Sequence, residues 1–379
     1  MKPLYIYFLA ASLACTSCSD SWLDLNPSTS VPTDQAFSSL EDAQSALNGI
    51  YRLASAHSYY GDNFFYFGDC RAADVQARMT KGDGRRVSPY YEYNVKATDS
   101  FNSSLPWNQV YKVIRQTNNL IAATESGLIK TTDEAALNEI KAQALAMRGL
   151  ALYDLIRVFA MPYSYDNGQS LGVPIVTTAT DQSSKPARNT VAECYDQIIT
   201  DLTNSLAGLS KEKKDGCLNY WAVQGILSRV YLNKLDYPNA YKAATDIIEN
   251  SKSLYQLYTL DEYSTVWGKE YTSESLFEFY FSLTEPSGGS GGEGAPMVYA
   301  NEEKVDWNNL ILSEDYLNLL NEDPQDVRHC VTEVSAIANN RRSSPKAPVT
   351  RKSIWRSSPA RPAIRATTTC ASCVCQRFI

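Results

Sequence analysis

The stretch from Asp133 to Phe159 constrains the fold most, because its apolar residues follow a helical period throughout. Its apolar side is too broad for a lone helix on a protein surface, so we predict a central helix against which others pack. Thr131 and Glu134 fit a capping box, which predicts the start of this helix. Arg148 and Arg157 interrupt the apolar side, and we interpret them as solvated or snorkelling side chains.

Shorter helical periods recur along the chain and predict an all-α protein of helical hairpins with long irregular loops and a few short strands. The expected helices cover Ala46–Leu53, Trp107–Ile121, Val191–Leu206, Trp221–Leu232, Ala240–Glu249 and Ser313–Leu320. A turn at Asp236–Asn239 would join two of them, and Leu227, Tyr231 and Ala240 have the spacing of a tetratricopeptide repeat. Ser273–Phe281 is expected to be a strand or an extended segment.

The charge of the chain is uneven. The 379 residues carry a net charge of −7, but residues 341–379 contain nine Lys or Arg and no Asp or Glu. The remainder is therefore strongly acidic, which argues against a nucleic-acid partner. No cofactor motif is present, because the glycine-rich run at Ser287–Gly294 lacks the Gly-Lys-Ser/Thr ending of a phosphate loop and is interpreted as a flexible linker.

Several segments, in this order, resemble the SusD/RagB family of surface glycan-binding lipoproteins. They are Ala144, Arg148, Leu150, Tyr153, Leu155, Arg157, Phe159 and Pro162, then Gly172–Val176, then Pro186–Val191, then Tyr195, Ile198, Asp201 and Leu202. The resemblance implies a fold of tetratricopeptide-like helical hairpins. It also implies an oligosaccharide ligand and a TonB-dependent outer-membrane transporter of the SusC type as partner.

The N-terminus has the features of a lipoprotein signal. A single Lys is followed by an apolar run and small residues, too short to span a membrane. We predict a signal peptide over residues 1–17, with Cys18 acylated as the new N-terminus and Cys15 as the alternative. Cys18 also fits the habit of the resembled family, a Cys shortly before Trp22-Leu23-Asp24. Residues 18–34 would be a tether, which implies a lipid-anchored protein of the outer membrane that faces the exterior.

The segment from His57 to Asn102 is irregular and combines aromatic with polar side chains. Aromatic faces stack on pyranose rings, while carboxylates, amides and Arg bind the hydroxyls. Any single Tyr here could instead be buried where the loop covers the helices. In the resembled family this region contributes ligand contacts. The predicted ligand-binding residues are Asp69, Arg71, Asp74, Tyr90, Tyr91 and Tyr93, with Tyr299 and Trp307 as second-tier candidates.

The apolar periodicity stops at about Val334, and the rest is rich in Ser, Arg and Pro. Cys370, Cys373 and Cys375 do not make a metal site by spacing alone, since zinc needs a fourth ligand, and we predict no metal. Codon choices consistent with Ser353–Phe378 allow a shifted reading frame that ends in ILRLSEVY, which resembles the late signature of the family. We therefore interpret residues 334–379 as a frameshifted, non-native tail, and residues 35–333 as an incomplete SusD-like domain.

The leading functional hypothesis is capture of an oligosaccharide at the cell surface and its delivery to the transporter, without chemistry. One alternative is a glycoside hydrolase, which needs two carboxylates about 5–10 Å apart across a cleft. Asp69 and Asp74 are available, but their spacing does not show that they face each other. Another is a tetratricopeptide-like scaffold that binds a protein. No nucleophile elbow or serine–histidine pairing is evident.

Overall fold

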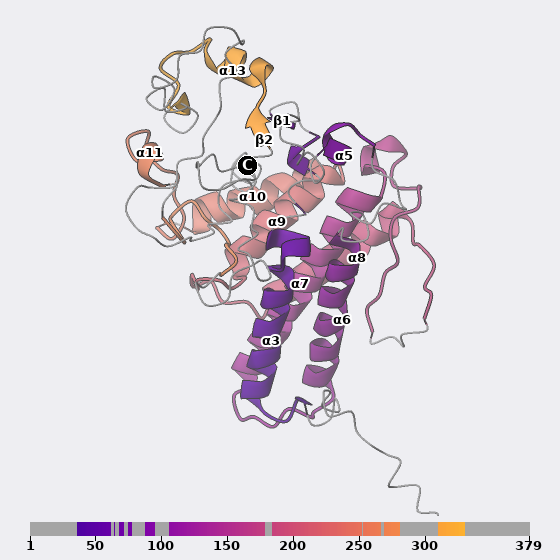
Figure 1. Cartoon of the computed structure of the whole chain (residues 1–379). Coiled ribbons are helices and arrows are strands. Elements are labelled where there is room, and N and C mark those ends of the chain that lie inside the picture. The colour runs from indigo at the N-terminus through magenta and orange to yellow at the C-terminus, as the bar shows by residue number, and fades with distance from the viewer. Residues whose placement is uncertain are drawn as a thin grey trace, which may run out of the picture.

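The computed structural model describes residues 36–61, 64, 68–71, 75–77, 88–94, 106–178, 184–251, 253–266, 269–280 and 310–329. These residues form an array of helices with a small two-stranded sheet at one end (Figure 1). The elements are α3 (Leu40–Ala54), η2 (His57–Gly61), β1 (Val75–Ala77), α5 (Ser88–Tyr91), α6 (Pro106–Glu125), α7 (Glu134–Phe159), η5 (Tyr163–Tyr165), α8 (Val191–Leu206), α9 (Tyr220–Asn233), α10 (Tyr237–Asn250), α11 (Tyr263–Val266), β2 (Leu310–Leu312) and α13 (Glu314–Leu320).

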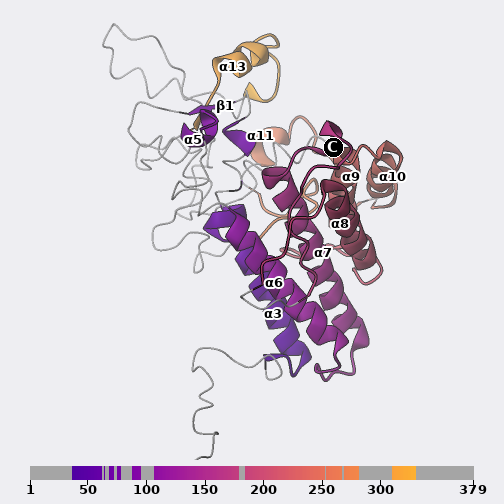
Figure 2. The same cartoon turned by 90° about the vertical axis from the view of Figure 1, so that its right-hand side faces the viewer.

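The long helices pack in the order in which they follow one another. α3 packs against α6, α6 against α7, α7 against α8, α8 against α9, and α9 against α10 (Figure 2). This arrangement confirms the predicted all-α fold of helical hairpins. Within the described ranges, no helix is both long enough and apolar enough to span a bilayer.

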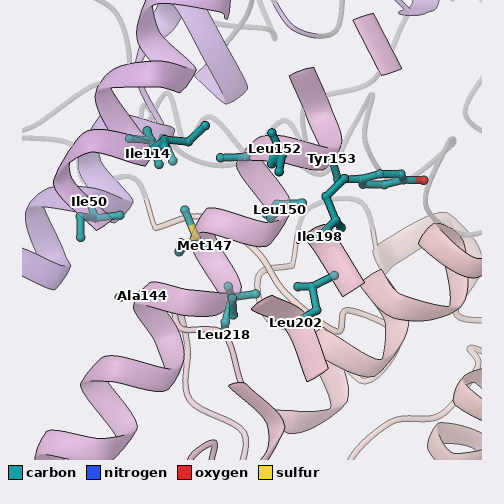
Figure 3. Packing of buried hydrophobic residues seen from close by; sticks show 14 of the residues in the cluster. Ile50, Ile114, Ala144, Met147, Leu150, Leu152, Tyr153, Ile198, Leu202 and Leu218 are labelled. Atoms are coloured by element: carbon teal, nitrogen blue, oxygen red, sulfur yellow. The ribbon is translucent and has the colours of Figure 1, made fainter. Parts of the chain in front are cut away.

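α7 is the centre of the array and contacts α3, α6, α8 and α9. Every residue from Ala142 to Ile156 is buried except Leu145, which is half-buried. Figure 3 shows its side chains interleaved with those of α8, and a Cβ at Gly149 would lie only 2.9 Å from Cγ of Leu202. Glycine therefore permits the close approach of α7 and α8, and the predicted central helix is confirmed.

The start of α7 differs from the prediction. Asp133 is the N-cap, because its Oδ1 accepts a hydrogen bond from the backbone N–H of Ala136 at 3.0 Å. The Thr131 hydroxyl accepts from the N–H of Asp133 instead, so the capping box predicted with Glu134 is wrong. Asp133, two residues after Thr131, can also serve as an N-cap, and the pattern Thr-x-x-Glu does not show which of these two residues caps the helix.

The prediction that Arg148 is solvated is also wrong. Its side chain is 9% exposed and makes two hydrogen bonds to Asp201 of α8, from Nε at 2.8 Å and from Nη2 at 2.6 Å. Nη1 donates to Oδ1 of Asn118 in α6 and to the carbonyl of Thr177. One guanidinium therefore joins α6, α7, α8 and the loop after η5, in the bidentate geometry that makes Arg–carboxylate pairs strong.

One further expectation needs correction. The chain from Asp236 to Asn239 does not form a free turn, because Asp236 caps α10 and Pro238 lies in the first turn, where proline is tolerated. For Ser273–Phe281 the prediction was a strand or an extended segment, and its described part, residues 273–280, contains no strand, so the extended segment is the alternative that remains. The sequence did not predict the antiparallel sheet, in which Val75 of β1 pairs with Leu312 of β2. The signal, tether, glycine-rich linker and tail lie outside the described residues.

Changing Asp201 to Asn would leave the buried guanidinium of Arg148 without an opposite charge. We expect the free energy of unfolding to fall by about 3–5 kcal/mol, as in other buried pairs that lose one partner. Urea unfolding followed by circular dichroism measures this loss. The control is Lys214→Ala, which breaks an exposed pair with Glu139 and should cost at most about 1 kcal/mol. Equal losses in the two variants would contradict a special role for the buried pair.

The capping box at the start of α8 makes the stability of the protein depend on pH. Glu193 accepts hydrogen bonds from the backbone N–H and the hydroxyl of Thr190, which lower the pKa of Glu193 below its ordinary value of 4.5. The unfolded chain therefore binds a proton more readily, so this stabilisation is present above pH 4.5 and is lost as the pH falls through the lower pKa. We expect Glu193→Gln to be less stable than the wild type at pH 7 and equally stable in strong acid. Thermal melts over a pH series check this.

Candidate ligand-binding surface

Two of the tyrosines in the aromatic segment are fixed beneath the surface. Tyr59 and Tyr60 belong to the π-helical turn η2, and both side chains are buried. Their hydroxyls donate to the same oxygen of Asp154, Oδ2, at 2.6 Å each. Nη2 of Arg157 donates to the other oxygen at 2.7 Å. A buried carboxylate in α7 is thus satisfied by three donors, and the tyrosines anchor the segment to the central helix.

Burial and the neighbouring Asp154 carboxylate raise the pKa values of Tyr59 and Tyr60 well above their ordinary value of 10. Both phenols therefore keep their protons throughout the physiological range and remain donors. Because a carboxylate cannot share a dry site with a phenolate without repulsion, this cluster holds only one negative charge, which Arg157 balances.

We call Tyr59, Tyr60, Asp154 and Arg157 the anchor, and further aromatic rings pack on it. The ring of Phe64 lies 5.5 Å from that of Tyr59 and 5.2 Å from that of Tyr60, and the ring of Phe279 lies 4.7 Å from that of Tyr60. The guanidinium of Arg157 lies over Phe64 at 5.4 Å. Arg157 was predicted to be solvated or snorkelling, and its side chain is 29% exposed, but the prediction did not include its ion pair or its cation–π contacts.

Beyond this layer, Arg71 and Tyr93 come together at the surface. The guanidinium carbon of Arg71 lies 5.2 Å from the centre of the Tyr93 ring, and the Tyr93 hydroxyl donates to the backbone carbonyl of Arg71 at 2.8 Å. Tyr93 is 66% exposed and Tyr91 is 37% exposed. Asp69 is half-buried, next to the buried Cys70. We call Asp69, Arg71, Tyr91 and Tyr93 the Arg71–Tyr93 surface.

The structure sorts the predicted ligand residues into three groups. It brings Arg71 and Tyr93 into contact, and it leaves Tyr91 accessible and Asp69 half-buried. Tyr90 is only 4% exposed, so its burial does not fit the stacking role predicted for it. Asp74, Tyr299 and Trp307, with the lipidation candidates Cys15 and Cys18, lie outside the described residues. Their roles stay predictions.

The small sheet links this region to a distant part of the sequence. α5 contacts β1, and β1 pairs with β2, which leads into α13 at the same end of the molecule (Figure 1). The pairing of β1 with β2 therefore joins the aromatic segment to the chain just after Tyr299 and Trp307, the second-tier candidates. Among the residues that the structure covers, no three His, Cys, Asp or Glu side chains are grouped to hold a metal ion.

Asp154, which accepts hydrogen bonds at the centre of the anchor, was not among the residues predicted from the sequence. A signal was available, since Asp154 lies in the most apolar part of the central stretch and is followed three residues later by Arg157. A carboxylate in a helix that is buried on all sides needs partners, because an unpaired buried charge is very costly. The sequence did not reveal which residues those partners would be.

Comparison with known proteins gives consistent matches. Residues 21–232 match a family model described as starch-binding associating with outer membrane. A SusD-like protein of Bacteroides ovatus is 26% identical over 262 residues, covering 66% of this chain and 45% of that protein. The chain thus spans about half the length of the curated relatives it matches.

Solved structures agree with the family match. A SusD superfamily protein from Bacteroides thetaiotaomicron is 66% identical with a TM-score of 0.76, and the match covers 80% of this chain and 66% of that one. Another SusD superfamily protein, from Bacteroides vulgatus, is 30% identical with a TM-score of 0.73, covering 78% and 66%. The helical array is therefore a shared fold.

Removing one anchoring hydroxyl should destabilise the protein. In Tyr60→Phe the Asp154 carboxylate loses a buried donor, and hydrogen bonds to charged groups contribute about 1.5–3 kcal/mol. We expect a fall of that size in the free energy of unfolding, measured by urea denaturation. Tyr91→Phe, at an accessible position, is the matched control and should change stability by less than about 0.5 kcal/mol. If both variants unfold alike, Tyr60 does not serve as an anchor.

Proposed function

The chain belongs to the SusD-like family, and from that membership we propose that it binds oligosaccharides at the Arg71–Tyr93 surface. The family description, starch-binding associating with outer membrane, supports a glycan ligand. We place the binding step at the cell surface and propose that the bound sugar passes to a SusC-like TonB-dependent transporter in the same membrane. The transporter follows from the family resemblance, and no described residue identifies its contact surface.

The observation that carries this proposal is the exposed ring of Tyr93 beside the guanidinium of Arg71. A pyranose has an apolar face that packs on an aromatic ring, and hydroxyls at its edge that accept hydrogen bonds from a guanidinium. We propose that Tyr91, two residues before Tyr93, and Asp69, two residues before Arg71, extend this surface with a second ring and a carboxylate that accepts hydrogen bonds. These groups suit a neutral, polyhydroxylated ligand.

The proposal requires no chemistry. Of the carboxylates near this surface, Asp154 is buried and fully engaged by Tyr59, Tyr60 and Arg157, which leaves it no role as an acid or base. The relatives are described as starch-binding, SusD-like or sugar-binding proteins, and from this we propose a binding protein and not a glycosidase. A labelled oligosaccharide incubated with the protein should be recovered intact, and release of shorter sugars would overturn this part of the proposal.

The domain organisation is likewise a proposal. A signal peptide at residues 1–17 and a tether at 18–34, acylated at Cys18, would anchor the protein in the outer membrane with the SusD-like domain facing outward. The family match begins within this tether, at residue 21. The domain would extend to residue 333, before the tail at 334–379. Mass spectrometry of membrane-extracted protein would detect the acylated N-terminus.

The double variant Tyr91→Ala/Tyr93→Ala tests the surface. Aromatic stacking contributes about 0.5–1.5 kcal/mol per ring beyond the buried area, so two rings should weaken binding by about ten-fold or more. Isothermal titration calorimetry with maltoheptaose and a panel of other soluble oligosaccharides measures the affinity.

The control for that variant is Tyr241→Ala on α10, which removes a ring that is 74% exposed on another part of the array. Its affinity should equal that of the wild type. Wild-type affinity in the double variant would show that the sugar binds elsewhere, and the site assignment would then be wrong.

A further inference from the structure

We propose that Asp154 is a positioning residue for ligand binding: it holds the Arg71–Tyr93 surface in its binding conformation without touching the ligand. This inference rests on the proposed function for its effect on affinity. Its structural part, the anchoring of the aromatic segment by one carboxylate, can be tested without any ligand.

The first argument is the geometry of two neighbouring tyrosines on one oxygen. Side chains of consecutive residues point about 100° apart on a helix and to opposite faces on a strand. The hydroxyls of Tyr59 and Tyr60 nevertheless both reach Oδ2 of Asp154 at 2.6 Å. They can do so because the backbone bends at Tyr59, where φ is −132° and ψ is −116°. The shared acceptor therefore selects this bent conformation of η2 over a regular one.

The second argument is the tight closure of the turn η2 itself, directly after the end of α3. The N–H of Gly61 donates to the carbonyl of Ala56 at 3.0 Å, and a Cβ at Gly61 would lie 2.8 Å from that same carbonyl. Backbone atoms cannot move aside as a flexible side chain can. The chain therefore leaves the anchor at a fixed place and in a fixed direction, provided that Tyr59 and Tyr60 stay bound.

The third argument is continuity from the anchor to the surface. Phe64 packs on both anchoring tyrosines and on the guanidinium of Arg157. Cys70, which is 1% exposed, belongs to the same hydrophobic core and directly precedes Arg71. The carbonyl of Arg71 then accepts the hydrogen bond from Tyr93. The exposed pair is thus built on backbone whose preceding residue, Cys70, is buried in the same hydrophobic core as Tyr59 and Tyr60.

The expected consequence is a loss of preorganisation. If the surface is in its binding conformation for only a fraction of the time, the apparent Kd rises by the inverse of that fraction. A fall in this fraction to about one-tenth would raise Kd about ten-fold. The rings of Tyr91 and Tyr93 would remain chemically intact, so the effect would come from their placement alone.

Asp154→Asn is the main variant, because it keeps the shape of the side chain and removes the charge that attracts the phenols and Arg157. Its matched control is Asp201→Asn, which disrupts the other buried ion pair of α7, with Arg148, but touches none of the anchor residues. Both variants lose a buried pair, so a general loss of stability should appear in both. A change confined to Asp154→Asn would be local.

The measurement is hydrogen exchange of backbone amides in residues 57–61, 68–71 and 88–94, on the full chain without ligand, followed by titration with maltoheptaose and the other sugars of the panel. We expect faster exchange in these residues and about ten-fold weaker binding in Asp154→Asn. Asp201→Asn should lower the stability of the whole array, but without additional exchange confined to these residues and with an affinity close to that of the wild type. If Asp154→Asn does not fold, Tyr59→Phe/Tyr60→Phe, which keeps both rings, replaces it with the same expectations.

The possible results separate the two proposals. Exchange and affinity that change equally in the Asp154 and Asp201 variants, or in neither, would overturn the positioning role while the binding function stands. If the wild type binds none of the sugars, the proposed function fails. Exchange would then still decide whether Asp154 holds the segment in place.

Discussion

The ion pair between Arg148 and Asp201 is the interaction on which the arrangement of the helices depends. Both groups have been taken out of water, which is costly, and only close bidentate contact with additional hydrogen bonds offsets that cost. The geometry supplies these through Asn118 and the carbonyl of Thr177. Sliding α7 against α6 or α8 by one turn would keep many apolar contacts but would leave the Arg148 guanidinium buried without its partners. We infer that the apolar surfaces stabilise the array, while this pair selects one register of its three central helices.

The same helix carries a second buried charge with a different task. Asp154 lies six residues after Arg148, so the two side chains leave α7 about 120° apart around its axis. One therefore faces α8, and the other faces the turn η2 beyond the end of α3. Since Arg148 and Asp154 belong to one helix, the packing that fixes α7 in the array also fixes the carboxylate that holds the aromatic segment. An irregular segment can then present side chains at fixed positions without a regular structure of its own.

The sequence predicted the helices well because apolar periodicity extends over many residues, as from Asp133 to Phe159. It did not predict the role of Arg148 or Asp154, because a period shows which side of a helix is apolar but not what lies opposite a charge. A helix surrounded on every side has no solvated face, so the usual interpretation of an interrupting Arg was wrong. The strands β1 and β2 were missed for another reason: each has three residues, too few to show alternation, and their pairing spans most of the chain.

The aromatic segment shows why composition alone could not separate ligand-binding residues from structural ones. Tyr59 and Tyr93 are the same residue type in the same irregular stretch, yet one is fully buried against a carboxylate and the other is 66% exposed. Tyr93 also has a left-handed backbone, with φ of 54°, which a bulky side chain adopts only at a cost. Its hydroxyl bond to Arg71 and the stacked guanidinium offset that cost before any ligand arrives. A sugar that stacks on this ring would therefore meet a surface already ordered, and less of its binding energy would be spent on ordering the protein.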